Sequence, residues 1–422
     1  MTTHPLVATL KGLKGNARGC VLTEPLWGIP YNLYAPYVSL YMLSLGLKDS
    51  QIGLIASIGL FFQILTASFS GILTDKLGRK KATFIFDLLS WSVPCLIWAV
   101  AHNFTYFVVA AIINSLWRVP SNSWMCLLVE DTDPGLLVDI YSWIYIAGLL
   151  AAFFAPFAGL LISTFSLVPT MRGLYLFTFV MMTAKFLIMN RMVTETRQGR
   201  VRMAQTENQG LLTLVSEYKG VLKLILKTTP TLYTIGIMLV LSTGLMISGT
   251  FWSILVTERL HIPPQDLGLY QLARSVIILL FYFLVMPRLR GIDFKKPMLV
   301  GFIGAMISQL VLITIPERSY FFLLISILFE ACSLAAVNTL TDKMIVVTVD
   351  EKERARIMAV IYVVVILFTS PFGWIAGNLS EINKILPFIL RIILLAIGGL
   401  LTYLAARSTK TSAEPLEVAS VS

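Results

Sequence analysis

Charged side chains are scarce in this sequence of 422 residues. They make up only 13% of it, about half of the roughly 25% that is typical of soluble domains. Histidine occurs three times and cysteine four times, and neither has the spacing of a metal site or a disulfide framework. A Walker loop, whose glycines would cradle the phosphates of ATP, is also missing. These absences argue against a soluble enzyme, a zinc protein and an ATP-driven pump.

Apolar residues are abundant instead. They make up 57% of the chain, with a mean hydropathy of +0.80, and they form runs of about 20 residues, the length that crosses a hydrocarbon layer of about 30 Å as a helix. Because open sheets and loops cannot satisfy their backbone groups in lipid, the composition predicts an all-α integral membrane protein. Basic loops that fix the membrane orientation then explain the net charge of +10, and we expect no nucleic-acid partner.

Twelve apolar segments are candidate membrane spans, in two groups of six. The longest polar stretch separates the groups, and its part 211–227 has the apolar spacing of an amphipathic surface helix. The expected spans are 21–45, 52–72, 82–101, 104–128, 138–163, 170–190, 231–256, 267–286, 298–315, 320–345, 357–378 and 385–406. The expected parts are a cytoplasmic segment 1–20, a six-helix bundle 21–190, a cytoplasmic central loop 191–228, a second six-helix bundle 229–406 and a cytoplasmic tail 407–422.

The basic residues predict the orientation in the membrane. With the N-terminus inside, cytoplasmic segments carry 24 of the 33 Lys and Arg residues, whereas the outer loops carry five. Since cytoplasmic loops are enriched in Lys and Arg, both termini are expected in the cytoplasm and the protein in the plasma membrane. Residues 1–20 are polar and basic, so we expect no cleavable signal peptide there.

The two halves repeat at an offset of 215 residues. Ile52-Gly53-Leu54 corresponds to Leu267-Gly268-Leu269, Lys80-Lys81 to Lys295-Lys296, and Pro156-Phe157 to Pro371-Phe372. Apolar helices share Leu and Phe in any case, but that explains a Gly, a basic pair and a Pro-Phe pair in one register poorly. An internal repeat of six spans is typical of transporters that are built from two pseudo-symmetric bundles.

Residues 71–81 form a short turn between two apolar segments, with two glycines and one acid among four basic residues. In content and spacing this turn resembles the signature loop between helices two and three of the major facilitator superfamily of secondary transporters. The matching positions are Gly71, Asp75, Gly78, Arg79 and Lys80. The resemblance implies twelve transmembrane helices in two pseudo-symmetric six-helix bundles, alternating access, and no covalent chemistry or cofactor.

The same resemblance implies a cytoplasmic gate. Asp75 would engage the N-terminal end of helix eleven, where the helix dipole favours an anion, and Arg79 would pair with an acid at the cytoplasmic end of helix four. The available partners are Glu130, Asp131 and Asp133. In the second half, residues 286–296 keep the basic character without the acid, so a lock there is expected to be weaker. The alternative is a tight turn whose bases only enforce topology.

Charged residues inside spans are a second signal, because each is unfavourable by about 2.5 kcal/mol or more at bilayer depth unless it is paired or hydrated. Arg118 shares one face of span four with Asn114 and Ser121, and Glu330 lies in span ten with Asn338 on the same broad face. Spans four and ten correspond under the repeat, and both line the central cavity in the family fold. We therefore predict that Arg118 and Glu330 form a charge pair on the substrate path. The alternatives are an ion pair buried within one bundle and an arginine that snorkels.

Span one carries a stripe of aromatic residues with an amide beside it. The residues concerned are Trp27, Tyr31, Asn32 and Tyr34. Such a face suits a small organic ligand, and packing between helices is an equally common use. Glu24 in the same span could exchange protons with the cytoplasm, although capping of the helix N-terminus is the preferred interpretation. For Asp87 in span three we expect pairing with a nearby base rather than a role in transport.

The predicted function is secondary active transport of a small organic solute by alternating access, coupled to protons because carboxylates such as Glu330 could titrate within the path. A facilitative uniporter and a drug or metabolite exporter of the same fold are alternatives, and residues 155–160 resemble the exporter pattern Gly-Pro-x-x-Gly-Gly only in part. From another class, a solute sensor or other non-transporting membrane protein is possible in principle, but the polar loop and tail are too short for a signalling domain. We expect a monomer in the bilayer, without a metal ion or enzymatic activity.

Overall fold

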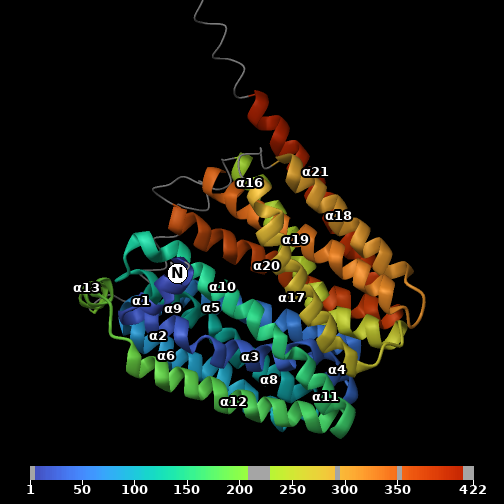
Figure 1. Cartoon of the computed structure of the whole chain (residues 1–422), viewed down its shortest axis with the longest axis horizontal. Helices are drawn as coiled ribbons and strands as arrows, with labels where there is room; N and C mark the ends of the chain where they lie inside the picture. The colour runs from blue at the N-terminus through green and yellow to red at the C-terminus, as the bar shows by residue number, and fades with distance from the viewer. Residues whose placement is uncertain (1–4, 208–228, 290–294, 349–353, 412–422) are drawn as a thin grey trace, which may run out of the picture. The chain divides into compact units, whose positions relative to one another are not determined.

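The computed structural model describes residues 5–207, 229–289, 295–348 and 354–411. These residues are almost entirely helical, and none of them forms a strand. They belong to two compact units (Figure 1): unit 1 comprises residues 1–217 with 263–275, and unit 2 comprises residues 218–262 with 276–422. The predicted surface helix 211–227 lies outside the described residues, as does the tail beyond residue 411.

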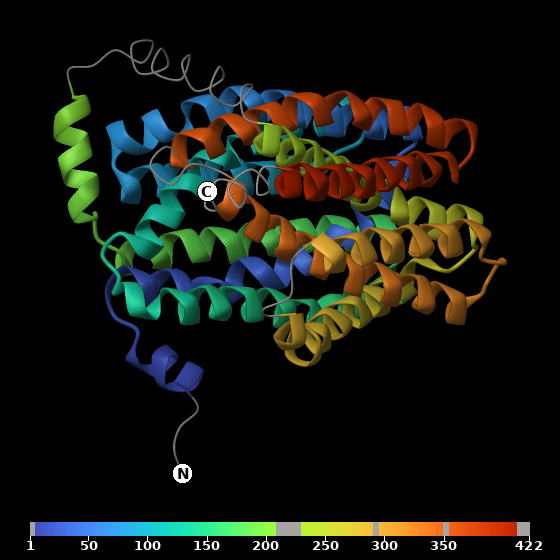
Figure 2. The same ribbon diagram turned by 90° about the horizontal axis from the view of Figure 1, so that it is seen from above.

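Unit 1 contains the first six predicted spans. Its helices are α1 (Pro5–Gly12), α2 (Gly15–Thr23), α3 (Pro25–Tyr34), α4 (Val38–Ser44), α5 (Asp49–Leu77), α6 (Arg79–Asp87), α7 (Val93–Ala99), α8 (Phe104–Asn114), α9 (Arg118–Val129), α10 (Leu137–Ala151), α11 (Ala155–Phe165), α12 (Leu167–Met192) and α13 (Arg197–Thr206). Helix α3 packs against α10, α11 and α12, whereas α9 packs against α5 and α6. Helix α13 differs from the others because it runs across the long helices rather than along them (Figure 2).

Prolines interrupt several of these spans. The π-helical turn η2 (Leu88–Ser92) precedes Pro94, and the 3₁₀ turns η3 (Ser115–Trp117) and η5 (Ala152–Phe154) precede Pro120 and Pro156. A proline ring collides with the carbonyl group four residues earlier and its nitrogen has no hydrogen to donate, so the preceding turn loses its regular α-helical bonds. In span one the 3₁₀ turn η1 (Ala35–Tyr37) itself contains a proline. Spans one, three and four are therefore irregular near their middles, where polar side chains gather.

Unit 2 contains the remaining spans as longer helices. They are α16 (Thr229–Ile254), α17 (Leu267–Leu284), α18 (Lys295–Thr314), α19 (Tyr320–Thr348), α20 (Arg354–Ile382) and α21 (Leu386–Thr411), with the short turns η6 (Leu255–Arg259), η7 (Pro264–Asp266) and η8 (Met286–Leu289) between them. Helix α18 packs against α19 and α21, and α16 packs against α20 and α21. The turn η7 and the first residues of α17 belong to unit 1, where the backbone N–H of Gly268 donates to the hydroxyl of Tyr37 at 3.1 Å.

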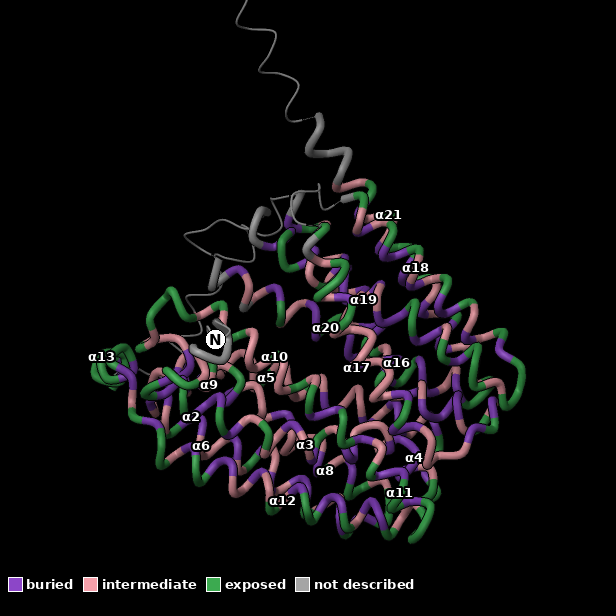
Figure 3. Tube along the Cα trace, in the orientation of Figure 1, coloured by how far each residue is buried: buried purple, intermediate pink, exposed green. Residues whose placement is uncertain are grey.

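Ten helices of the described ranges are long and apolar enough to cross a membrane, judged by length and composition. Predicted spans one and four are not in this set. Both carry polar residues that lower their mean hydropathy, such as Asn32 in span one and Asn114 and Arg118 in span four. With these two, each predicted span has a helical counterpart close to its expected bounds. Buried and exposed residues alternate along helices such as α12 (Figure 3), and its exposed residues Leu176, Phe177 and Val180 are apolar, as expected of a surface that faces lipid.

Candidate functional site

The turn between α5 and α6 holds a group of polar residues that we call the gate cluster: Asp75, Arg79, Glu130, Glu195 and Thr196. Arg79 is buried, with 5% of its side chain exposed, and its Nη1 lies 2.8 Å from Oδ1 of Asp75. Its Nη2 lies 3.1 Å from Oε1 of Glu130, and its Nε donates to both oxygens of that carboxylate at 3.2 Å. Of the three acids predicted as partners of Arg79, Glu130 is therefore the one that contacts it.

The other two acids have different local roles. Asp131 accepts the backbone N–H of Arg197, at 3.4 and 3.3 Å, and Asp133 accepts the backbone N–H of Gly135 at 2.9 Å. The predicted contact of Asp75 with helix eleven would join the two units and stays a prediction. Gly71 lies inside α5, and Lys80 contributes its backbone N–H rather than its ammonium group to the cluster.

Glu195 is a member of the gate cluster that the sequence pattern did not reveal. Its carboxylate accepts the backbone N–H groups of Arg79 and Lys80, both at 3.0 Å, and so satisfies the first two free donors of α6 with an anion at the positive end of the helix. Gly78 makes this approach possible, because its φ is +82° and a Cβ there would lie 2.5 Å from Oε2 of Glu195. The hydroxyl of Thr196 donates to Glu130.

Helix α13 completes the cluster. Nε of Arg202 in α13 lies 3.3 Å from Oδ2 of Asp75, so Asp75 contacts an arginine from α6 and another from the segment that follows span six. Three parts of unit 1 are thereby tied together: the α5–α6 turn, the end of α9 and the segment after α12. Charge-assisted hydrogen bonds of this kind are stronger than neutral ones.

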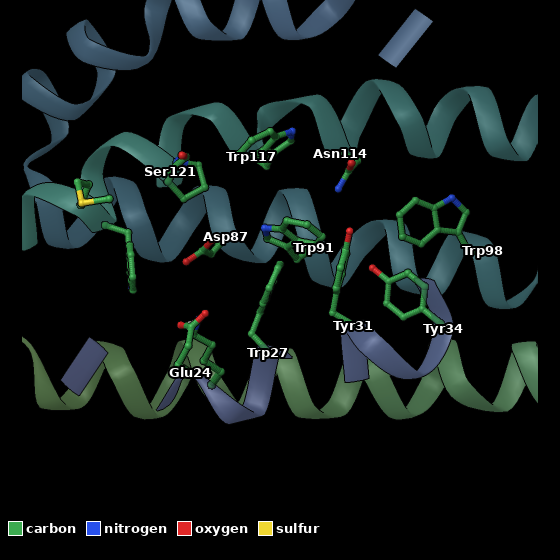
Figure 4. A pocket seen from close by; sticks show the side chains of 14 residues that line it. Glu24, Trp27, Tyr31, Tyr34, Asp87, Trp91, Trp98, Asn114, Trp117 and Ser121 are labelled. Atoms are coloured by element: carbon green, nitrogen blue, oxygen red, sulfur yellow. Dashed lines mark hydrogen bonds and ion pairs between the residues drawn. The ribbon is translucent and has the colours of Figure 1, made fainter. Parts of the chain in front are cut away.

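A second site lies inside unit 1, where a cavity of about 580 Å³ opens between α3, α7, α9 and α12. We call it the aromatic cavity (Figure 4). Its lining residues are Glu24, Trp27, Tyr31, Tyr34, Asp87, Trp91, Trp98, Asn114, Trp117, Pro120, Ser121, Trp124, Met125 and Lys185. The ring of Trp27 stacks on Tyr31 with centroids 4.8 Å apart, and Trp91 meets Trp27 edge-on at 5.2 Å.

One ion pair lies at the edge of this cavity. Nζ of Lys185 is 2.9 Å from Oε2 of Glu24, and the same ammonium group is 5.8 Å from the ring centre of Trp27 and 5.9 Å from that of Trp124. The expected role of Glu24 as a helix cap is wrong, because its side chain makes no capping hydrogen bond at the start of α3. Its carboxylate compensates the buried ammonium of Lys185 instead.

Asp87 carries the second carboxylate of the cavity. Only 8% of the residue is exposed, and within the described residues its carboxylate accepts no hydrogen bond and forms no close ion pair. The nearby base Lys185 acts on Asp87 through its charge, but its close ion pair is with Glu24, so the expected pairing of Asp87 is not a direct one. In Figure 4 the carboxyl groups of Asp87 and Glu24 point toward one another across the cavity. Asp87 is the last residue of α6, directly before the π-helical turn η2, and its side chain lines the cavity.

The remaining predicted path residues of unit 1 divide into two groups. Tyr31, Tyr34, Asn114 and Ser121 line the aromatic cavity. Asn32 is turned away from it, with its amide bonded to the carbonyl of Gly28 at 2.8 Å and accepting from Gln271 at 3.5 Å. Arg118 does not line the cavity either, because its Nε donates to Gln63 at 3.1 Å and its guanidinium carbon lies 4.2 Å from the ring centre of Trp117.

Glu330 is paired within unit 2. Its Oε1 lies 2.6 Å from Nη1 of Arg391, with 5% and 2% of the two side chains exposed, and Ser248 and Gln309 bond the same arginine nitrogen at 3.1 Å. This arrangement matches the alternative of an ion pair buried within one bundle, so the charge of Glu330 is compensated without Arg118. Asn338 lies further along α19 and is exposed.

Comparison with known proteins identifies relatives that match part of this sequence. A sequence model of the Major Facilitator Superfamily matches residues 27–285, more than half of the chain. The Quinolone resistance protein NorA of Staphylococcus aureus (strain MSSA476) is 24% identical over 237 residues, which cover 56% of this chain and 57% of that protein. The NorA protein of strain MRSA252 is 30% identical over 102 residues, 24% of this chain and 26% of that one. The chain thus matches little more than half the length of the first of these curated relatives and about a quarter of the second.

Solved structures match over nearly the full length. The nucleoside transporter NupG has a TM-score of 0.69 at 15% identity and covers 94% of this chain and 99% of its own. A POT family transporter in complex with a thioalcohol conjugated peptide has a TM-score of 0.71 at 12% identity, with coverage of 96% and 100%. At these identities the likeness concerns the fold alone. The predicted fold, two six-helix bundles in a helical membrane protein, is confirmed.

Proposed function

The chain belongs to the Major Facilitator Superfamily and is a multi-pass membrane transporter, and from this premise we propose that it moves a small organic solute by proton-coupled secondary active transport. The aromatic cavity of unit 1 would hold the solute. Its volume of about 580 Å³ falls within the range of roughly 300–1,000 Å³ that is usual for small-molecule sites. As in those sites, its wall combines apolar and aromatic rings with a few polar groups.

Asp87 is the observation on which proton coupling rests. Intramembrane carboxylates are unfavourable and commonly serve as proton relays, and this one faces a cavity without a bonded partner among the described residues. The charged groups that face it are Glu24 and Lys185, which are already paired with each other. Asp87 can therefore accept and release a proton without breaking an existing ion pair. Glu330, the first candidate for this role, is compensated by Arg391.

The gate cluster supports alternating access. Arg79 joins the end of α5 to the end of α9, and Glu195 adds the segment after α12. We infer that these contacts form when the cytoplasmic side of the transporter is closed and break when it opens. The acids that hold the buried Arg79 are partly exposed, 22% for Asp75 and 16% for Glu130, so water can reach them and replace these contacts. As predicted for the family's signature turn, Asp75 and Arg79 would be the groups that change partners.

An exporter is the second candidate within this function. It is favoured by the relatives named for quinolone resistance and by the aromatic lining of the cavity. A facilitative uniporter would lack any response to a proton gradient, and a sensor would bind a solute without moving it. The direction of net solute movement separates the exporter from an importer.

Transport by the purified protein in liposomes tests the proposal. With an imposed proton gradient, we expect accumulation of at least one solute from a panel of neutral, cationic and anionic compounds. For a neutral solute, Asp87→Asn should lower gradient-driven accumulation at least tenfold and leave downhill exchange of that solute intact, because the proton needs the carboxylate of Asp87 whereas binding of a neutral solute does not. Glu317→Gln, which removes an exposed carboxylate of unit 2, serves as the matched control. Full gradient-driven transport by Asp87→Asn would refute the proton role, and bound solute without flux would point to the sensor.

A further inference from the structure

We propose that the aromatic cavity binds a monovalent organic cation with a flat aromatic body, and that Asp87 is its counter-charge. This inference rests on the proposed function only in treating the cavity as a solute site. Binding itself requires neither a gradient nor a change of access. The argument depends on the charges of the cavity, on its rings and on its donor set.

The charges of the cavity favour a cation. Its described lining contains two carboxylates, Asp87 and Glu24, and a single ammonium group, that of Lys185. Lys185 and Glu24 compensate each other at 2.9 Å, which leaves the negative charge of Asp87. A buried charge without a close partner is unfavourable, so a ligand with one positive charge should bind here more tightly than a neutral or anionic ligand of the same shape. An anion would have to draw Lys185 away from Glu24 and would be repelled by both carboxylates.

The rings favour an organic cation. Trp is the best partner for a cation at a distance of up to about 6 Å from the ring centre, and Lys185 already lies at such distances from Trp27 and Trp124. The cavity thus holds one cation of its own in this manner. Trp91, one turn beyond Asp87 in the same span, also lines the cavity, so a ligand could place its charge against the carboxylate and its flat face against this ring.

The donor set disfavours a metal ion. Among the described residues, none form a group of three or more His, Cys, Asp and Glu side chains that could hold one. A hard cation also prefers six or more oxygen ligands, whereas this lining consists largely of aromatic carbon. The ligand class is therefore an aromatic amine in its protonated form or a quaternary aromatic ammonium ion.

Isothermal titration of the purified full-length protein in detergent at pH 8 tests this assignment with three probes of similar shape. N-methylquinolinium carries a permanent positive charge, quinoline is neutral and 2-naphthoate is an anion. We expect N-methylquinolinium to bind at least tenfold more tightly than quinoline, and 2-naphthoate to bind most weakly. Asp87→Asn should weaken N-methylquinolinium at least tenfold and leave quinoline unchanged, whereas Lys185→Met should strengthen N-methylquinolinium because it frees Glu24. Glu317→Gln should change none of the three.

The outcomes separate this inference from the transport function. Quinoline or 2-naphthoate bound as tightly as N-methylquinolinium by the wild-type protein would overturn the inference, as would unchanged cation affinity in Asp87→Asn. Retained quinoline binding shows that a variant is folded. If a variant does not fold, the order of the three affinities in the wild-type protein still tests the preference for a cation. Cation binding without flux in liposomes would contradict the transport proposal alone, and proton-driven flux of a neutral solute with no cation preference would contradict this inference alone.

Discussion

A buried ion pair in unit 2 shows what a single intramembrane charge does for stability. Glu330→Gln would leave Arg391 in a site where 2% of its side chain is exposed, with Ser248 and Gln309 as neutral partners. Breaking a buried pair by removing one member destabilises by about 3–5 kcal/mol, so we expect a clearly lower midpoint of thermal unfolding in detergent. The double variant Glu330→Leu with Arg391→Met should recover most of the loss, since it removes both charges.

The control for this variant is Glu317→Gln, whose side chain is 74% exposed and whose loss should leave the midpoint unchanged. If Glu330 titrated on the substrate path instead, Glu330→Gln would keep its stability and change the response of transport to pH. Equal midpoints for Glu330→Gln and the wild-type protein would therefore contradict the structural role of the pair.

The carboxylates of Glu330 and Asp87 also show what the sequence alone does not predict. The pattern places Glu330 and Asp87 at membrane depth, but their partners depend on the rotation of each helix about its own axis. The partner of Glu330 is 61 residues away on α21, and several intramembrane arginines were equally available to it in the sequence. Asp87 follows the basic turn closely in the chain, yet the start of η2 directs it into the cavity. Glu130 was predictable because the signature turn names the kind of partner and the end of span four offers only three acids.

At the scale of an element, the N-terminus of α6 depends on a side chain from another segment. Glu195 accepts hydrogen bonds from the backbone N–H groups of Arg79 and Lys80. Loss of a helix cap lowers the stability of a helix by about 0.5–2 kcal/mol. We therefore expect Glu195→Ala to speed amide hydrogen exchange at the start of α6. Asp133→Ala, which removes a capping carboxylate from the turn after α9, is the control and should leave α6 unchanged. Unaltered exchange at Arg79 and Lys80 in Glu195→Ala would show that water caps the helix equally well.

The elements themselves were predictable to within a few residues because apolar runs of membrane length leave little choice of structure. Their interruptions were not, although each has a proline nearby. Pro94 and Pro120 each predict an irregular helical turn. The sequence does not predict that the first is a π-helical turn and the second a 3₁₀ turn. That outcome depends on which neighbouring helix satisfies the released carbonyl group. The aromatic cavity lies at these irregular turns, so its lining could be predicted only in part, from the stripe of span one.

At the scale of the whole molecule, the distribution of basic residues predicts which side of the membrane holds the gate cluster. Cytoplasmic loops are enriched in Lys and Arg. The α5–α6 turn carries one arginine and three lysines, and α13 carries three arginines. We expect fluorescence of a green fluorescent protein joined after residue 411, because it becomes fluorescent in the cytoplasm. Alkaline phosphatase joined after Glu317, in the loop between α18 and α19, should be active, because this enzyme becomes active only outside the cytoplasm. Fusion of the phosphatase after Lys48, in the loop between α4 and α5, should be active as well. Active phosphatase after residue 411 together with inactive phosphatase after Lys48 would place the gate cluster outside, and Arg79 would then close the opposite side of the transporter.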